Sequence, residues 1–231
     1  MSSAGDFMIL LALETCGEYT SVALWQDDES LERHIESPAR HTEVLLPLCE
    51  ELRALGGIRL AQLDGVAFGA GPGAFTGVRV AASAAQGIAL AHDLPLLPIS
   101  SLAALAYGGW RTTGLRHQLA LLDARRNEVY WGFYAKCDNT AGLIALTADQ
   151  LTSSSGVIPP VQTPFGAVGR GCEVLTPEDR SRLAPAVMAP AEYFFPHARD
   201  VAALAALELR AGRGRTAEEA QPVYLRAALQ P

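Results

Sequence analysis

A glycine-rich block that follows an apolar run constrains the fold of this chain more than any other part of the sequence. Residues 63–68, which are apolar except for Asp64 and Gly65, predict a short buried strand, and the block 69–73 follows at once. Because residues 76–91 then carry a helical pattern, the block predicts a sharp turn from a strand into a helix. The positions assigned to this loop are Gly69, Gly71, Pro72, Gly73, Phe75, Thr76, Gly77 and Arg79.

Three interpretations of the glycine-rich block remain open. It is a purely structural turn, or its amides at the helix start hold an anion or contact a partner, or it binds a dinucleotide. The dinucleotide fingerprint is matched formally by Gly69, Gly71 and Ala74, but Pro72 has no amide to offer a pyrophosphate. A Walker A loop is excluded, because no Gly-Lys-Ser/Thr sequence ends the block.

The flanking patterns predict an α/β chain of two lobes. Strands are expected at 8–13, 21–25, 31–36 and 95–99, and helices at 42–55, capped by Thr42 and ended by Gly56 and Gly57, and from 100 to 107. The order of strands and helices then partly repeats, with strands at 117–123, 128–134, 143–147 and 166–169 and a helix at 197–211. We therefore predict lobes at residues 1–103 and 104–231, with the last segment crossing back to the first lobe.

Composition narrows the classes of function. The chain has 231 residues, 49% of them hydrophobic, so it can bury a core, and its formal net charge is −7. A protein that binds nucleic acid by itself usually carries a basic surface, so we expect any link to RNA to run through a more basic partner. The four cysteines fit neither a zinc site nor a disulfide framework. No stretch predicts a targeting signal or a membrane span, and we expect a cytoplasmic protein.

Five blocks spread over residues 8–226 resemble the TsaB (YeaZ) family: ILLALETCGEYTSVAL, RHTEVLLPL, GPGAFTGVRV, DARRNEVYWGFY and QPVYLR. The resemblance implies the actin-like ATPase (ASKHA) fold, in which each lobe is a mixed sheet with flanking helices. It also implies a non-catalytic scaffold in the complex that forms tRNA threonylcarbamoyladenosine. There the chain would bind and activate TsaD and help to recruit TsaE.

The histidines do not predict a metal site. The catalytic relative TsaD carries a His-x-x-x-His pair on a helix, whereas here His41 is followed four residues later by Leu45. His34 precedes the predicted helix, and His92, His117 and His197 stand alone in the sequence. We expect structural or surface roles for them, and no bound metal.

A nucleotide site is predicted only in vestigial form. In active members of the superfamily, an acidic residue and glycines in each hairpin approach the nucleotide. Here Glu14 and Thr15 take these positions in the first hairpin and Asp123 in the second, while Gly169 and Gly171, around Arg170, weakly resemble a separate nucleotide loop. Arginines, not glycines, follow Asp123, so we expect no cofactor held by this chain alone; ADP or ATP would bind at a subunit junction. The alternative function is a nucleotide-dependent kinase or phosphotransferase, and a third is a dinucleotide-binding oxidoreductase.

The two long helices of the first lobe predict an interface. The helix at 42–55 carries more apolar side chains than one buried face needs, and the helix at 76–91 carries a stripe of small residues. The resemblance implies that these helices pack on TsaD, or form a homodimer when TsaD is absent. The predicted interface residues are His41, Val44, Leu45, Leu48, Leu52, Val78, Ala82 and Ala85.

Overall fold

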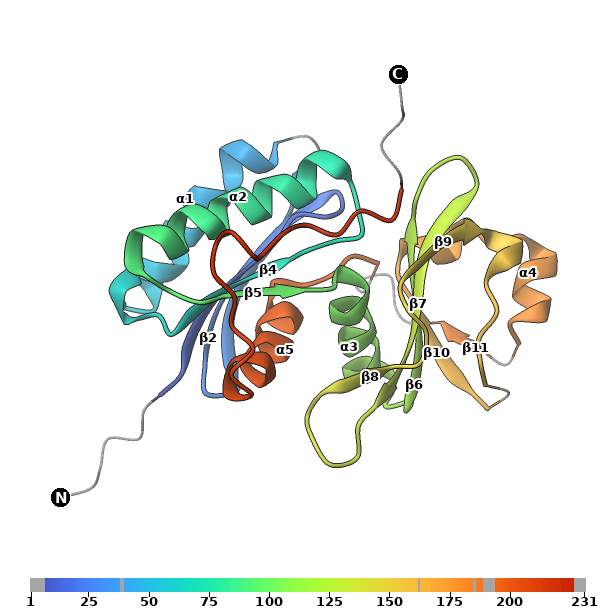
Figure 1. The fold of residues 1–231 in the computed structure, drawn as a ribbon. Coiled ribbons are helices and arrows are strands. Elements are labelled where there is room, and N and C mark those ends of the chain that lie inside the picture. Colours follow the sequence, from blue (N-terminus) through green and yellow to red (C-terminus); the bar gives the residue numbers. More distant parts are fainter. Residues whose placement is uncertain (1–6, 38–39, 162, 185, 189–193, 227–231) are drawn as a thin grey trace.

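Two mixed sheets stand side by side, each with helices packed against it (Figure 1). The computed structural model describes residues 7–37, 40–161, 163–184, 186–188 and 194–226. The first sheet has the strand order β3-β2-β1-β4-β5, in which β1, β2 and β3 are antiparallel and β4 and β5 run parallel to β1. Its strands are β1 (Ile9–Glu14), β2 (Tyr19–Gln26), β3 (Glu29–Glu36), β4 (Gly65–Gly69) and β5 (Leu96–Ile99).

Helices cover both faces of this first sheet. Helices α1 (His41–Leu55) and α2 (Phe75–His92) lie on one face, and α5 (Ala198–Arg210) lies on the other (Figure 1). Along β1, Leu11 and Leu13 point into the cluster under α1 and α2, whereas Leu10 and Ala12 point toward α5. A central strand buried on both faces explains why its sequence is a continuous apolar run.

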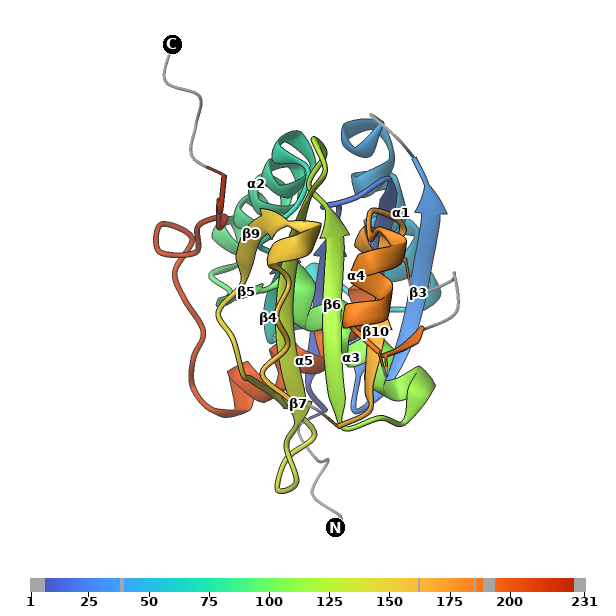
Figure 2. The ribbon, with the colours of Figure 1, turned by 90° about the vertical axis from the view of Figure 1, so that its right-hand side faces the viewer.

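The second sheet has the order β11-β10-β6-β7-β8, with β9 also paired to β7. Helix α3 (Ser101–Thr113) and helix α4 (Pro177–Arg182) lie on its opposite faces (Figure 2). The strands are β6 (His117–Asp123), β7 (Glu128–Lys136), β8 (Leu143–Ala145), β9 (Gln150–Ser153), β10 (Phe165–Val168) and β11 (Ala186–Met188). Three short 3-10 turns complete the described elements, at Leu60–Gln62, Ser154–Gly156 and Arg170–Glu173.

The chain returns to the first sheet after α5. Residues 215–226, which we call the C-terminal strap, run past α2 and end beside the turn between β6 and β7 (Figure 1). Arg215 pairs with Leu96 at the sheet edge, and the Gln86 side-chain amide donates to the carbonyl oxygens of Ala217 and Ala220. Ala220 is fully buried. The strap therefore connects the glycine-rich side of the first lobe to the second lobe.

The predicted elements are confirmed in kind and order, and their ends differ. Helix α1 starts at His41, so Thr42 lies inside the first turn and its prediction as the cap is wrong; the predicted end at Gly56 is confirmed. Helix α3 runs to Thr113, six residues beyond the predicted end. The predicted lobe division between residues 103 and 104 falls inside α3. Strands β9 and β11 and helix α4 were not predicted.

Candidate functional site

A cleft of about 670 Å³ lies between the two lobes. Its walls come from four segments: the β1–β2 turn, the glycine-rich loop, the β6–β7 turn and the C-terminal strap. Phe195 and Arg170 close the remaining side. Residues far apart in the sequence thus meet at one place, which makes this cleft the site to test for chemistry.

The glycines of the loop are explained by close packing against the β1–β2 turn. A Cβ atom on Gly73 would lie 2.5 Å from the Cys16 Cβ, and one on Gly77 would overlap the carbonyl oxygen of Thr15. The Ala74 amide donates to the Cys16 carbonyl oxygen at 2.7 Å, and the Thr15 hydroxyl donates to the Gly77 carbonyl oxygen at 2.6 Å. The geometry therefore supports the structural interpretation of the block over anion or dinucleotide binding.

Glu14, the predicted acidic residue of the first hairpin, is sealed away from the cleft. Its side chain is 2% exposed, and a Cβ atom on Gly69 would overlap its carboxylate. One carboxylate oxygen accepts from the Cys16 amide at 2.6 Å and the other from the Ser101 hydroxyl at 2.7 Å. Burial raises the pKa of Glu14, and these hydrogen bonds oppose that rise. A carboxylate in this position cannot reach a ligand in the cleft.

Asp123 of the second hairpin and the two predicted glycines after β10 are also occupied by protein contacts. The Asp123 carboxylate accepts from the Arg125 amide at 2.7 Å and from its guanidinium at 3.0 Å. Gly169 has a φ of 104°, which favours glycine, and a Cβ atom there would overlap the Leu121 carbonyl oxygen. Gly171 approaches the Leu121 backbone in the same way. These two glycines allow a close approach to β6.

The carboxylates that do line the cleft are paired with arginines. Glu18 bonds Arg170 and lies 3.4 Å from Arg125, and Asp123 bonds Arg125 as described. Carboxylates paired with arginines are poor general bases and poor ligands for the metal ion that accompanies a nucleotide phosphate. Within the described part of the cleft lining, this leaves no free acidic group for phosphoryl transfer.

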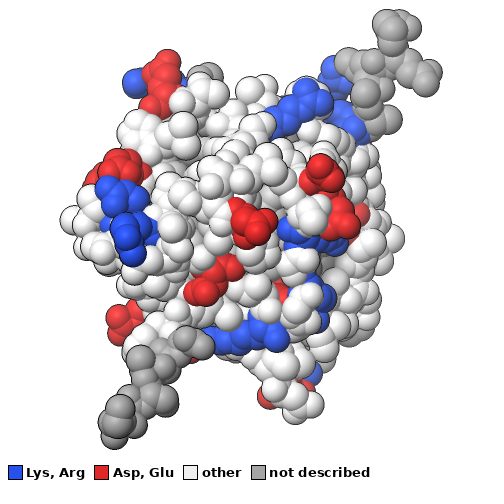
Figure 3. Space-filling model, turned by 60° about the vertical axis from the view of Figure 1, so that its left-hand side comes forward, with Lys and Arg blue, Asp and Glu red and all other residues white. Residues whose placement is uncertain are grey.

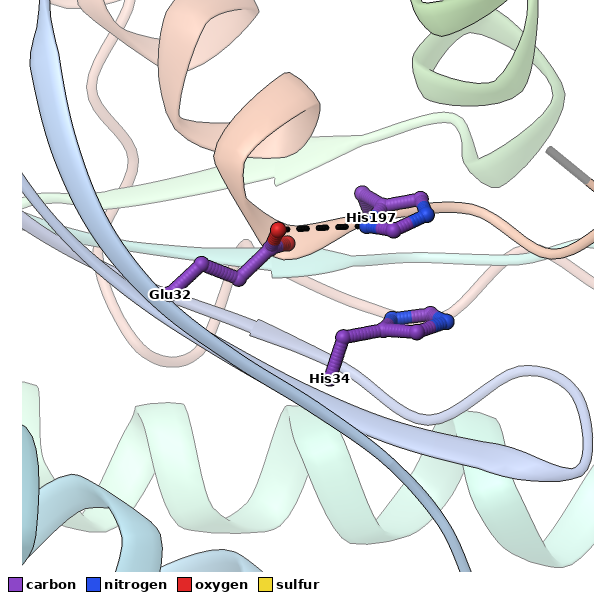
Figure 4. Close-up of side chains that lie close together, drawn as sticks. All are labelled: Glu32, His34 and His197. Atoms are coloured by element: carbon purple, nitrogen blue, oxygen red, sulfur yellow. Dashed lines mark hydrogen bonds and ion pairs between the residues drawn. The ribbon is translucent and has the colours of Figure 1, made fainter. Parts of the chain in front are cut away.

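A second cluster of titratable groups joins β3 to the start of α5. Glu32, His34 and His197 come together there, although His34 and His197 stand alone in the sequence (Figure 4). His197 Nδ1 lies 3.1 Å from Glu32, and the two imidazole rings stack 3.8 Å apart at 14°. Hydrogen bonding and charge from His197 and Arg199 outweigh the effect of burial and lower the pKa of Glu32 to about 2. Burial lowers the pKa of His34 to about 4.

This histidine cluster does not suit a metal ion as it stands. The nitrogen lone pairs of two stacked rings lie in two nearly parallel planes 3.8 Å apart, so they do not converge on one ion. The Arg199 guanidinium also lies 3.4 Å from Glu32 and places a positive charge beside the carboxylate. The cluster is better explained as a partly buried ion-paired contact.

The predicted interface residues lie mainly in the chain's own core, which corrects that prediction. Val44 is half-buried, and the other seven are buried: His41, Leu45, Leu48, Leu52, Val78, Ala82 and Ala85. Helices α1 and α2 pack on each other as well as on the sheet, so each buries a wider apolar face than a single contact needs. The large apolar side chains left exposed on these helices are Leu46, Leu55, Phe75 and Leu90.

The face drawn in Figure 3 is largely uncharged, with acidic and basic side chains interspersed. No helix among the described residues is long and apolar enough to cross a membrane.

Comparison with known proteins identifies the class. Residues 35–163 match the family model described as TsaD: tRNA N6-adenosine threonylcarbamoyltransferase. Two solved structures from Pseudomonas aeruginosa, YeaZ and an uncharacterized protein with similarity to peptidase YeaZ, are each 35% identical, with TM-scores of 0.85 and 0.86. The alignments cover 94% and 95% of this chain and all of theirs. Together with the two mixed sheets, these matches define an actin-like two-lobed protein related to the TsaD type.

Curated relatives refine this assignment. The tRNA threonylcarbamoyladenosine biosynthesis protein TsaB of Escherichia coli is 33% identical over 95% of both chains. TsaB of Haemophilus influenzae is 44% identical over 54% of this chain and 52% of its own. The chain belongs to the TsaB (YeaZ) family.

Proposed function

We propose that this chain is a non-catalytic partner subunit in tRNA threonylcarbamoyladenosine biosynthesis. In this proposal it binds and activates a TsaD-type transferase and helps to recruit TsaE, and it meets tRNA through the complex. Since the pathway acts on tRNA, we place the protein in the cytoplasm. The single observation that carries the non-catalytic role is the burial of Glu14 behind Gly69, outside the cleft.

The polar groups of the cleft support this proposal. A kinase or phosphotransferase needs a carboxylate that can reach a metal-bound phosphate or accept a proton. Glu14 is enclosed, and both Glu18 and Asp123 are paired with arginines. A nucleotide such as ADP or ATP would then bind at a junction with another subunit, and this chain would contribute no cofactor of its own.

The outer face of α1 and α2 is the proposed contact with the transferase. Leu46 is 55% exposed, Leu55 58% and Leu90 70%, whereas the inner leucines of α1 are buried. Specific interfaces commonly bury roughly 1,600 Å² around a few apolar anchors. The same face would pair two copies of this chain when the transferase is absent.

A binding experiment tests this surface. Leu46→Glu combined with Leu90→Glu places charges on exposed positions, so we expect an unchanged thermal midpoint and a loss of binding to the transferase by calorimetry. Ile158→Glu is the control, because Ile158 is equally exposed (69%) but belongs to the second lobe. Unchanged affinity of the double variant would contradict the proposed surface. The kinase alternative would instead be supported if the chain alone turned over ATP in a steady-state assay and Asp123→Asn abolished that turnover.

A further inference from the structure

An arginine of α2 packs on one aromatic ring and bonds a neighbouring tyrosine at the rim of the cleft. The Arg79 Cζ lies 3.7 Å from the centre of the Phe75 ring, and its Nε donates a 2.9 Å hydrogen bond to the Tyr224 hydroxyl. The two rings are 5.3 Å apart. Phe75 is 55% exposed and Tyr224 is 45% exposed, although large aromatic side chains usually bury most of their surface. The cluster therefore presents a cation and two adjacent aromatic rings on the surface.

The C-terminal strap fixes Tyr224 from both sides. Before it, the Val223 amide donates to the Ala70 carbonyl oxygen at 2.8 Å. After it, the Arg226 guanidinium donates to Glu128 at 2.7 Å and to the Ala124 carbonyl oxygen at 2.9 Å. Because the strap is tied to both lobes, Tyr224 and Arg79 are arranged before any partner arrives. A site that is already ordered loses less conformational entropy when a partner binds.

Arg79 differs from the other arginines of the cleft in its pairing. Arg125 and Arg170 contact Glu18, and Arg226 contacts Glu128. Among the residues that the structure describes, no carboxylate lies within ion-pair distance of Arg79, and none accepts a hydrogen bond from its two Nη groups. With Nε directed at Tyr224, the outer edge of the guanidinium is left for a ligand. A planar carboxylate fits that edge with two parallel hydrogen bonds.

A protein carboxylate suits this site better than a nucleic-acid backbone. Backbone recognition needs several unpaired cations together, whereas the arginines beside Arg79 are neutralised and the chain carries a net charge of −7. An arginine beside exposed Phe and Tyr side chains matches the enrichment of aromatic residues and arginine at protein interfaces. Arg79 also lies on α2, the helix whose outer residue Leu90 belongs to the proposed partner surface.

We infer that Phe75, Arg79 and Tyr224 form a receptor for an Asp or Glu side chain of the partner subunit, and that the C-terminal strap is therefore part of the interaction site. This inference rests on the proposed function, because it needs a protein partner on the α2 side.

Calorimetry with the purified TsaD-type subunit of the same genome tests the receptor. We expect Arg79→Ala to weaken binding about 30-fold, the range of a hot-spot residue. Arg79→Lys should weaken it about 10-fold, because a point charge loses the two parallel bonds. Tyr224→Phe should cost several-fold through the lost hydrogen bond. Arg116→Ala, which breaks an exposed ion pair with Asp138 on the second lobe, should stay within twofold.

A double-mutant cycle then identifies the partner group. Each acidic residue on the partner's contact helices is changed to its amide, and one of these changes should cost no further affinity in the Arg79→Ala background. The inference is overturned if Arg79→Ala binds within threefold of the parent chain, if no partner carboxylate couples to it, or if the variant loses only tRNA binding. A parent chain that never binds the transferase would instead refute the proposed function itself.

Discussion

Replacing Gly77 by alanine should destabilise the protein, whereas the same change ten residues along the same helix should stabilise it. A Cβ atom on Gly77 would overlap the Thr15 carbonyl oxygen, and the Gly77 carbonyl oxygen accepts the buried Thr15 hydroxyl. Gly87 is exposed, and a Cβ atom there meets nothing within 4 Å. The pair therefore separates the effect of packing from the helix propensity of alanine.

The expected magnitudes follow from these contacts. Forcing an extra carbon into a packed site costs about 1–3 kcal/mol. Relief of the clash also moves the carbonyl oxygen of residue 77 away from the Thr15 hydroxyl, and a buried hydroxyl without its acceptor costs about 1–3 kcal/mol. Alanine has a higher helix propensity than glycine, which offsets about 1 kcal/mol of these costs. Gly77→Ala should thus lower the free energy of unfolding by about 1–5 kcal/mol, while Gly87→Ala should raise it by about 0.5–1 kcal/mol.

Urea unfolding followed by circular dichroism measures both variants against the parent chain. If Gly77→Ala proves as stable as Gly87→Ala, the glycine-rich block is not held by packing on the β1–β2 turn. Its glycines would then need another explanation, such as access for a ligand.

Three further outcomes are expected. Leu48→Asp should unfold the chain or lower its stability by at least about 3 kcal/mol, since it places a charge in the core, whereas Leu46→Asp should change urea stability by less than about 0.5 kcal/mol. The pKa of His34 is about 4 in the folded chain, against an ordinary value of 6.5, so the unfolded chain binds the proton first as pH falls. Stability should therefore decline between pH 6.5 and 4, and His34→Phe should make that decline shallower in urea titrations at each pH. Glu14→Gln should leave tRNA modification by the reconstituted complex within twofold, and a collapse of activity would show that the carboxylate takes part in chemistry.

Continuous apolar runs made most strands of the first lobe predictable. β1, β2 and β4 are buried on both faces and read as apolar runs, and the glycine-rich block marks the start of α2 within one residue. Strand β9 is mostly polar, and β11 is apolar but only three residues long; both are partly exposed. Sequence periodicity identifies such strands poorly.

The site was predicted less well than the fold, for reasons that are three-dimensional. The spacing of the leucines on α1 indicates a buried face. It does not show whether that face packs on a partner or on a neighbouring helix of the same chain, and in the structure it packs on the sheet and α2. The stacking of His34 on His197 joins residues 163 positions apart, and the contact of Arg79 with Tyr224 joins residues 145 apart. No local pattern reports such pairs. Only the family resemblance singled out the strap, through its QPVYLR sequence.

Reconstituted tRNA modification tests the central claim most directly. The assay combines tRNA, the threonylcarbamoyl-adenylate substrate, the TsaD-type transferase and TsaE, with and without this chain, and measures modified adenosine. The account predicts no product from this chain alone, little from the mixture without it, and full modification when all are present. Product formed by this chain in the absence of the transferase, or full modification without this chain, would contradict it.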